Sequence, residues 1–399
     1  MRVKACLMFA VLLTLLLLGV LFICQLEVRW SKTFGGADYD LAWSIVQTSD
    51  GGYALAGVTG SYGAGGGDFW IVKTDSSGNE EWSKTFGGER DDWARSVIQT
   101  SDGGYALAGG TDSYGAGGED FWIVKTDSSG NEEWSKTFGG ADSSGAESIV
   151  QTSDGGYALA GVTMSYGAGG VDFWIVKAES SGNEEWSKTF GGADYDFAES
   201  IVQTSDGGYA LAGSTESYGA GGFDFWLVKT DSSGNEEWSK TFGGENDDWA
   251  YSVVQTSDGG YVLAGSTMSY GAGGEDFWLV KTDSSGNEEW SKTFGGVNRD
   301  WARSVIQTSD GGYALAGGWL LKTDSSGNEE WSKTFGGANG GTAWSIVQTS
   351  DGGYALAGGS GANFWLVKLG APVPDTLSLA LIGLIVAVAL IGLILVCKL

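Results

Sequence analysis

The chain has 399 residues, a formal net charge of −28 at pH 7 and an isoelectric point near 4.1. Such acidity repels phosphate backbones and argues against nucleic acid as a partner. The chain contains no histidine, which excludes Ser-His-Asp and Cys-His catalysis and removes the commonest zinc ligand. We predict no metal and no cofactor. Cys6, Cys24 and Cys397 all lie in the apolar ends, so the central part has no disulfide.

Residues 1–26 begin with Arg2 and Lys4 and continue with an apolar run over 5–26. Basic residues before a long apolar stretch are typical of secretion or anchoring, with the N-terminus inside. We see no cleavage site of the A-x-A type. The segment is therefore either a cleaved signal peptide or an apolar helix that acts as a signal anchor.

The central part repeats one unit. Six steps separate seven copies of the tag WSKTFGG, and the first five steps are 52 residues each while the sixth is 41. A fixed period of this size indicates one supersecondary unit that is copied and stacked. The tags begin at Trp30, Trp82, Trp134, Trp186, Trp238, Trp290 and Trp331.

Each copy holds four runs that suit β-strands. In the second copy these are 96–100, 105–109, 121–126 and 132–138, all rich in β-branched and aromatic residues. The sequences SDGG (101–104) and DSSGN (127–131) between them are typical of tight turns. No window has helical periodicity. Four antiparallel strands per copy predict an all-β fold, a β-propeller with one blade per copy.

The ends of the array predict a closed ring over residues 27–368. The last copy stops after its third strand, 364–368, and the first tag, 28–34, is a fourth strand without the other three. If the two pair, the N-terminal strand closes a seven-bladed propeller and leaves no exposed sheet edge. Blade six has lost 11 residues between its second and third strands.

The segment KTDSSGNEEW (73–82) and its copies resemble the tryptophan-docking motif of quinoprotein-like (PQQ-type) β-propellers. The Gly-to-Trp spacing of that motif matches, and the Asp-to-Gly spacing is one residue shorter. The resemblance implies the propeller architecture and no particular activity. The cysteine pair with which those dehydrogenases hold their quinone has no counterpart here.

After the propeller, residues 369–376 contain both prolines of the chain and predict a short, stiff linker. Residues 377–397 are uncharged and would form a helix of about 32 Å, long enough to span a bilayer. Lys398 follows, so the C-terminus is expected inside. The stretch 373–378 resembles the C-terminal sorting signals read by exosortase- and archaeosortase-type enzymes. A permanent transmembrane anchor is the alternative that we favour.

Strand directions assign the loops to two faces. The SDGG and DSSGN turns share one face with both chain ends, and we call it the turn face. The connectors between blades and the SYGAGG loops lie on the other, the connector face. Because the apolar segments leave from the turn face, we expect that face to lie against the membrane and the connector face to point outward.

The last residue of each connector feeds the innermost strand and should line the mouth of the central channel. This position varies among copies, whereas the turns are nearly identical. Loop variation on a fixed scaffold is typical of a binding surface, and drift in functionless loops is the alternative. The seven residues are Trp43, Arg95, Glu147, Glu199, Tyr251, Arg303 and Trp344.

Two further positions recur on this face. An aspartate could contribute to a ring that holds Ca²⁺, or could cap the turn into its own strand, which we favour. It is found at Asp40, Asp92, Asp196, Asp248 and Asp300. The aromatic residue after it could stack on sugars, or pack between blades, which we favour. It is found at Trp93, Phe197, Trp249 and Trp301.

The sequence shows no catalytic constellation, so an enzyme is the less favoured interpretation. We predict a monomeric, membrane-anchored propeller on the extracytoplasmic side of the cell membrane that binds a protein or a glycan through its connector face. The connectors at Asp92, Asp248 and Asp300 are part of this predicted binding surface. A polysaccharide hydrolase or lyase that uses clustered aspartates on the same face is one alternative. A structural surface-coat protein is the other.

Overall fold

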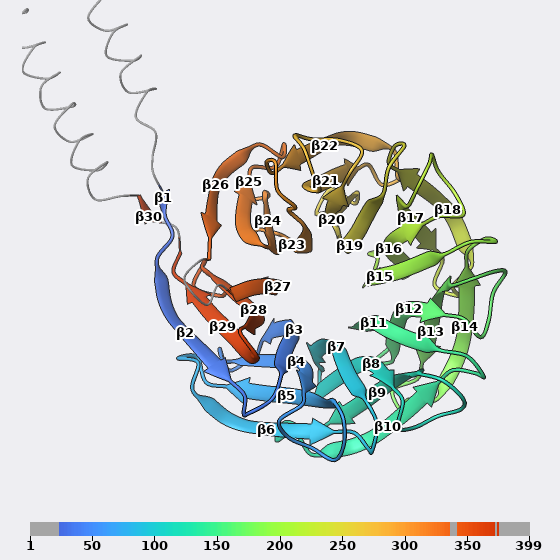
Figure 1. The fold of residues 1–399 in the computed structure, drawn as a ribbon, viewed down its shortest axis with the longest axis vertical. Helices are drawn as coiled ribbons and strands as arrows, with labels where there is room; N and C mark the ends of the chain where they lie inside the picture. The colour runs from blue at the N-terminus through green and yellow to red at the C-terminus, as the bar shows by residue number, and fades with distance from the viewer. Residues whose placement is uncertain (1–23, 336–340, 372, 375–399) are drawn as a thin grey trace, which may run out of the picture.

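The computed structural model describes residues 24–335, 341–371 and 373–374. Within these ranges the strands form seven four-stranded antiparallel sheets, arranged as blades around a central axis (Figure 1). The predicted all-β, seven-bladed propeller is confirmed. The described residues include no helix, and hence none that could cross a membrane. The predicted flanking helices lie outside the described residues, except for residues 24–26.

The blades are built alike from the axis outward. The innermost strands are β3 (Asp40–Gln47), β7 (Asp92–Gln99), β11 (Ser144–Gln151), β15 (Asp196–Gln203), β19 (Asp248–Gln255), β23 (Ala302–Gln307) and β27 (Gly341–Gln348). The second strands are β4 (Tyr53–Thr59), β8 (Tyr105–Thr111), β12 (Tyr157–Thr163), β16 (Tyr209–Thr215), β20 (Tyr261–Thr267), β24 (Tyr313–Gly317) and β28 (Tyr354–Ser360).

The third strands are β5 (Asp68–Thr74), β9 (Asp120–Thr126), β13 (Asp172–Ala178), β17 (Asp224–Thr230), β21 (Asp276–Thr282), β25 (Trp319–Thr323) and β29 (Asn363–Leu369). The outermost strands are β6 (Glu80–Phe86), β10 (Glu132–Phe138), β14 (Glu184–Phe190), β18 (Glu236–Phe242), β22 (Glu288–Phe294), β26 (Glu329–Thr334) and β2 (Val28–Phe34). A separate short pair joins β1 (Cys24–Gln25) to β30 (Val373–Pro374).

Burial explains the strand sequences. The second and third strands are buried on both faces between neighbouring blades, which is why YALAG and DFWIVK read as continuous apolar runs. The outermost strand is exposed at its start and half-buried beyond it. In blade six, Gly318 alone joins β24 to β25, and their pairing is retained (Ala316 opposite Leu320). The loop is missing there and both flanking strands are shorter, with 5 residues each against 7 in β20 and β21, but the strand cores survive as predicted.

The N-terminal strand closes the ring. Strand β2 pairs antiparallel with β29, with Trp30 opposite Lys368. Along the channel, a serine hydroxyl of each innermost strand accepts a hydrogen bond from a backbone N–H of the next blade. These contacts also join the seventh blade to the first, which we call the seam, where Ile45 N donates to Ser345 Oγ over 3.3 Å. Near the turn face, a glutamine of each innermost strand accepts a hydrogen bond from a backbone N–H of the preceding blade, and Ser350 N donates to Gln47 Oε1 over 2.9 Å. The predicted closure is confirmed.

The innermost strands begin earlier than predicted. Strand β7 starts at Asp92, not at Ser96, because its pairing with β8 continues through a bulge at Arg95. Ala94 lies opposite Gly109 and Ser96 opposite Ala108, so Arg95 is the extra residue. In six of the seven blades the second half of the connector is therefore part of a strand, whereas β23 of blade six begins only at Ala302. In the same way β29 extends to Leu369, the first residue of the predicted linker.

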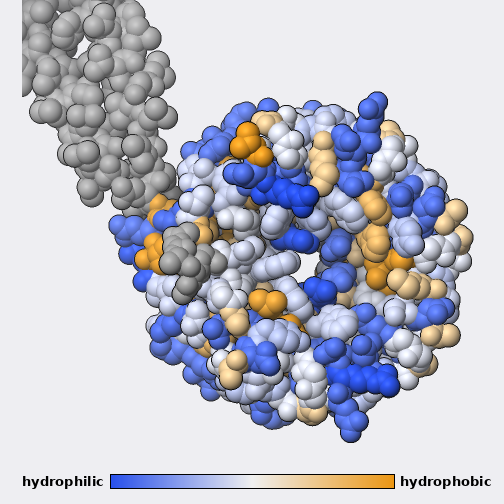
Figure 2. Space-filling model, in the orientation of Figure 1, coloured by the Kyte–Doolittle hydropathy of each residue, from blue (hydrophilic) through white to orange (hydrophobic). Residues whose placement is uncertain are grey.

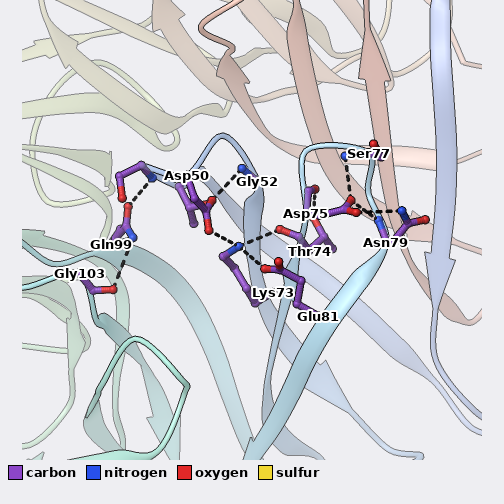
Figure 3. A network of polar contacts seen from close by, with 12 residues as sticks. Asp50, Gly52, Lys73, Thr74, Asp75, Ser77, Asn79, Glu81, Gln99 and Gly103 are labelled. Atoms are coloured by element: carbon purple, nitrogen blue, oxygen red, sulfur yellow. Dashed lines mark hydrogen bonds and ion pairs between the residues drawn. The ribbon is translucent and has the colours of Figure 1, made fainter.

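A buried lysine ties the turns of each blade together (Figure 3). Lys73 is only 3% exposed, and its ammonium group lies 2.8 Å from Asp50 and 2.6 Å from Glu81. It also donates to the carbonyl of Thr74. The same arrangement recurs at Lys125, Lys177, Lys229, Lys281 and Lys322. At the seam, Lys368 pairs with Asp351, and Arg29 occupies the position of the glutamate.

The tryptophans of the WSK tags join successive blades. The ring of Trp82 makes an edge contact with Tyr105 of the next blade, with centroids 5.6 Å apart. It also lies against Gly130 in the next DSSGN turn, where a Cβ would fall 2.5 Å from the ring. The same pair of contacts begins at Trp30, on Tyr53 and Gly78. These contacts give the tryptophans of the tags a structural role at the interfaces between blades.

This contact gives a stability prediction. Gly130→Ala should lower the free energy of unfolding by about 2–4 kcal/mol, because the added methyl group displaces the Trp82 ring in addition to straining a backbone at φ +76°. Gly103→Ala is the matched control, since Gly103 has φ +86° with no atom within 4 Å of the added Cβ. It should cost about 1 kcal/mol. Urea unfolding measures both, and equal losses would contradict the tryptophan contact.

Hydrogen bonds confirm the two faces. On the connector face, Asp38 N donates to Ser61 Oγ of the SYGAGG loop over 2.9 Å. On the turn face, the SDGG aspartates reach the lysines at the ends of the third strands. Both chain ends lie on the turn face, because Val28 is paired with Leu369 and Gly370 N donates to the carbonyl of Glu27. Leu26 is buried against the sixth and seventh blades.

Candidate functional site

The structure brings the seven predicted channel residues together in one ring. Each occupies the bulge position of an innermost strand or its equivalent, so its side chain lies at the inner wall of a blade. We call the set the channel-mouth ring. Figure 2 shows an opening at the centre of the propeller with mostly hydrophilic residues around it. The members are Trp43, Arg95, Glu147, Glu199, Tyr251, Arg303 and Trp344.

Two arginines organise this ring. The guanidinium of Arg95 lies 4.2 Å from the ring centroid of Trp43, and its Nε lies 3.4 Å from Glu147 Oε2. The guanidinium of Arg303 lies 3.9 Å from the centroid of Tyr251 and 5.0 Å from that of Trp344. Stacking on aromatic faces holds a planar guanidinium in place while its N–H groups stay available for acceptors.

The two glutamates of the ring have raised pKa values. Enclosure by the surrounding blades raises the pKa of Glu147, although its side chain remains 24% exposed, and Arg95 and Arg303 oppose the rise. Burial and then the neighbouring Glu147 raise the pKa of Glu199 to about 8, against the same two arginines. At neutral pH the mouth therefore presents two fixed cations beside carboxyl groups that hold protons easily.

The sequence did not single out Glu119, which lies beside this ring. Its carboxylate occupies space that Gly110 and Gly145 leave open, since a Cβ on either would meet Glu119 Oε1. Burial, followed by the charges of Glu147 and Asp112, raises the pKa of Glu119 to about 7, while Arg95 lowers it. The sequence did contain an indication that Glu119 differs from its counterparts. The residue before the DFW of each third strand varies among copies, as the channel position does, but it lies in no connector.

The recurring aspartates serve their own connectors. Asp92 is fully buried, and its carboxylate accepts hydrogen bonds from Gly88 N, Thr111 Oγ1 and Ser113 Oγ. Asp248 is buried likewise and accepts from Gly244 N. Asp300 accepts from Gly296 N. This is the capping arrangement, and it places these three predicted site residues away from the channel-mouth ring.

The aromatic residues next to them are half-buried, and two of them pack between blades. Trp249 contacts Phe197 and Phe223 of the preceding blade, with centroid distances of 5.9 and 4.2 Å. Trp93 is half-buried and bonds to Glu119. Trp301 is half-buried at the same position of its blade. All four are half-buried on the connector face, and the packing between blades that the sequence favoured is found for Phe197 and Trp249.

The arrangement offers binding contacts more readily than chemistry. The described residues contain no group of three or more Asp, Glu or Cys side chains placed to hold a metal ion. Within the described ranges the ring combines stacked cations, carboxyl groups and aromatic faces, which suits recognition of a ligand with mixed polarity.

Comparisons with known proteins identify the fold. No protein-family model matches the chain. The regulatory protein FlaEY of Caulobacter vibrioides is 26% identical over 250 residues, which is 54% of this chain and 25% of that protein. The chain thus spans about a quarter of this curated relative's length. Neither result identifies the quinoprotein type, which stays a prediction.

Solved structures match at low identity. The WD40 β-propeller domain of Doa1 has a TM-score of 0.56 at 13% identity, over 87% of this chain and 97% of that one. Sqt1 from Chaetomium thermophilum has 0.55 at 13%, over 88% and 100%. The Pan2 WD40 domain of Neurospora crassa has 0.57 at 12%, over 88% and 98%. These likenesses show the propeller fold alone.

Proposed function

We propose that the chain is a non-catalytic binding module that recognises a protein ligand at the channel mouth. One observation carries the proposal. The channel-mouth ring holds four residue types in seven blades (two Trp, two Arg, two Glu and one Tyr), whereas the turns and strand cores around it are almost the same in all seven. Diversity among contacting side chains on a constant scaffold is what recognition by a repeated fold requires.

The chemistry of the ring favours a protein over a uniform polymer. Arg95 and Arg303 present hydrogen-bond donors that stacking holds in a fixed orientation. Glu147 and Glu199, in the third and fourth blades, add carboxyl groups to the same ring. A polypeptide segment offers carbonyls, charges and aromatic groups in one short stretch, which matches this mixture. Arginine and aromatic residues are also the usual energetic centres of protein interfaces.

The hydrolase or lyase alternative is the weaker one. It depends on clustered aspartates of the connector face as reacting groups, and Asp92, Asp248 and Asp300 are three of the recurring ones. The carboxylates of Asp92 and Asp248 are fully buried, and all three accept hydrogen bonds within their own connectors. A polysaccharide could not approach the buried pair without unfolding the connectors, so we retain the binding interpretation.

We further propose that the propeller is anchored in the cell membrane on its extracytoplasmic side as a monomer. Two observations support this part of the proposal. The apolar segments 1–26 and 377–397 flank the ring, and the pairing of β1 with β30 holds their starting points together on the turn face. The connector face then points away from the bilayer. Protease accessibility of connector loops on intact cells tests this orientation.

The binding proposal predicts a specific loss. Peptides selected from a random displayed library on the full-length chain should bind Arg95→Ala/Arg303→Ala at least 10-fold more weakly, because both stacked donors are removed. Lys32→Ala/Lys84→Ala is the matched control. These lysines are half-buried on the outermost strands, and they bond to Asn79 and Asn131 on the turn face, away from the channel-mouth ring. Peptides that bind the arginine variant as tightly as the parent chain, or lose affinity only with the lysine variant, would refute the proposal.

A further inference from the structure

A second kind of site lies away from the channel, in a groove between the first two blades. A cavity of about 540 Å³ opens there, between the end of β6 and the blade built from β7–β10. A neighbouring cavity of about 450 Å³ lies on the connector side. The ring of Tyr114 lines both, so it forms the wall between them.

Tyr114 is an unusually well-held surface residue. It is 46% exposed, yet its hydroxyl donates to the carbonyl of Gly87 in the preceding blade over 2.8 Å. Its ring also contacts Trp122, with centroids 5.2 Å apart. When a ligand stacks on this ring, the Tyr114 side chain therefore loses little conformational entropy, because its rotamer is already fixed in the free protein.

The rest of the groove is polar. Hydroxyl groups come from Thr85, Ser135 and Thr137, and charged groups from Glu132 and Lys136. An aromatic face bordered by hydroxyl, carboxylate and ammonium groups matches a sugar ring, which has one C–H face and an edge of hydroxyls that both donate and accept. A purely apolar ligand would leave these polar groups without partners. A polyanion would be repelled by a chain of net charge −28.

The arrangement recurs in five blades. The equivalent tyrosines are 46–48% exposed, and each hydroxyl donates over 2.7–3.0 Å to a backbone carbonyl of the preceding blade. Each ring also lies 5.2–5.5 Å from the tryptophan of its own third strand. These residues are Tyr62, Tyr114, Tyr166, Tyr218 and Tyr270. The sixth and seventh copies lack the SYGAGG loop and its tyrosine.

We infer that the groove at Tyr114 and the equivalent positions beside the other four tyrosines are carbohydrate subsites, and that the propeller binds a neutral or N-acetylated polysaccharide through several of them at once. The subsites are distinct from the channel-mouth ring, so the inference does not depend on the proposed protein ligand. Equivalent subsites would also explain why the blades are nearly identical, because a polymer of repeating sugars needs the same contacts at each blade. A polymer held at one groove meets the next at high effective concentration, so weak single sites add up to firm binding.

The test uses the full-length chain and insoluble chitin, cellulose and mannan, with alginate as the polyanion. We expect retention on at least one of the first three and none on alginate. Replacing Tyr114 alone with Ser should weaken retention several-fold, and replacing all five tyrosines should abolish it. Tyr114→Phe keeps the ring and should retain most of the binding. Tyr195→Ser is the matched control, because Tyr195 is 49% exposed but belongs to a connector.

Several outcomes would overturn the inference. They are no retention of the parent chain on any neutral or N-acetylated polymer, unchanged retention of the folded five-fold variant, or equal losses for Tyr114→Ser and Tyr195→Ser. Should the five-fold variant not fold, the series of one, two and three replacements decides, since retention must fall stepwise with the number of rings removed. Arg95→Ala/Arg303→Ala should bind the polysaccharide normally, which separates this inference from the proposed protein ligand.

Discussion

A chain that lacks residues 1–35 should lose most of its cooperative stability, whereas a chain that lacks only residues 1–23 should keep it. The longer deletion removes β2, which completes the seventh blade by pairing with β29. It also removes Trp30 from its contacts with Tyr53 and Gly78 of the first blade. The shorter deletion leaves every described residue in place.

The expected size of the effect follows from these contacts. Truncating a packed tryptophan costs about 3–5 kcal/mol, and a domain has about 5–15 kcal/mol in total. The deletion also removes the bond from Trp365 Nε1 to Ser31 Oγ and uncovers the full edge of β29. Thermal unfolding of both chains, followed by circular dichroism, measures the difference.

A synthetic peptide of residues 24–35 provides the control for this prediction. If the loss arises from the missing strand, the peptide should raise the unfolding midpoint of the truncated chain in proportion to the logarithm of its concentration. A scrambled peptide should not. Equal midpoints for the two deletions would mean that the ring does not depend on its N-terminal strand.

The fold was predictable because its signals are local and repeated. The SDGG and DSSGN turns, the four apolar runs and the unpaired tag at Trp30 each appear in a few consecutive residues, and their order alone specifies a closed ring. The membership of the channel-mouth ring followed from the same logic. One position per blade, such as Arg95, faces the axis in every copy.

The parts that could not be predicted depend on contacts between blades. Nothing near Glu119 indicates that Gly145, in the next blade, leaves room for its carboxylate. The bulge at Arg95 is likewise a property of the pairing with β8, not of the strand itself. The groove of Tyr114 arises because a glycine carbonyl of the preceding blade accepts its hydroxyl, and that partner lies 27 residues away. Such contacts become visible only when the blades are placed side by side.

Stability should also depend strongly on pH, and acid should be destabilising below about pH 4. Partial burial opposes ionisation of Asp102, but hydrogen bonds from Thr100, Lys125 and Gly104 outweigh it and lower the pKa to about 2. The equivalents in other blades are lowered to about 2 at Asp50, Asp154, Asp206, Asp258 and Asp351, and Asp310 is lowered as well.

A lowered pKa means that the stabilisation is present above the unfolded value of 3.8 and is lost as the pH falls toward 2. The carboxylates of these pairs are 57–61% exposed, so screening reduces each contribution to about 0.5–1 kcal/mol. Seven such pairs together should cost roughly 3–7 kcal/mol of stability in acid. Urea unfolding midpoints measured between pH 5 and pH 2.5 at constant ionic strength test this loss of stability in acid.

Above pH 4 we expect the free energy of unfolding to fall as the pH rises. Burial raises the pKa of Asp224 to about 6, Ala220 N opposes the rise, and Asp248 across the blade interface adds to it. Asp224 is 1% exposed, and its Oδ1 has no hydrogen-bond partner. A raised pKa means that the stabilisation of the protonated form is complete below 3.8 and is lost as the pH rises through about 6. Stability should therefore peak near pH 4 and decline toward pH 8.

Asp224→Asn isolates the loss of stability above pH 4, because an amide resembles the protonated carboxyl group and cannot ionise. It should raise the free energy of unfolding at pH 8 by about 1–3 kcal/mol and leave it nearly unchanged at pH 4. Asp120→Asn is the matched control, since Ser144 stands where Asp248 faces Asp224, and its gain should be smaller. If both variants gain equally, repulsion between carboxylates of adjacent blades is not the cause. If neither gains, the buried aspartates do not limit stability at neutral pH.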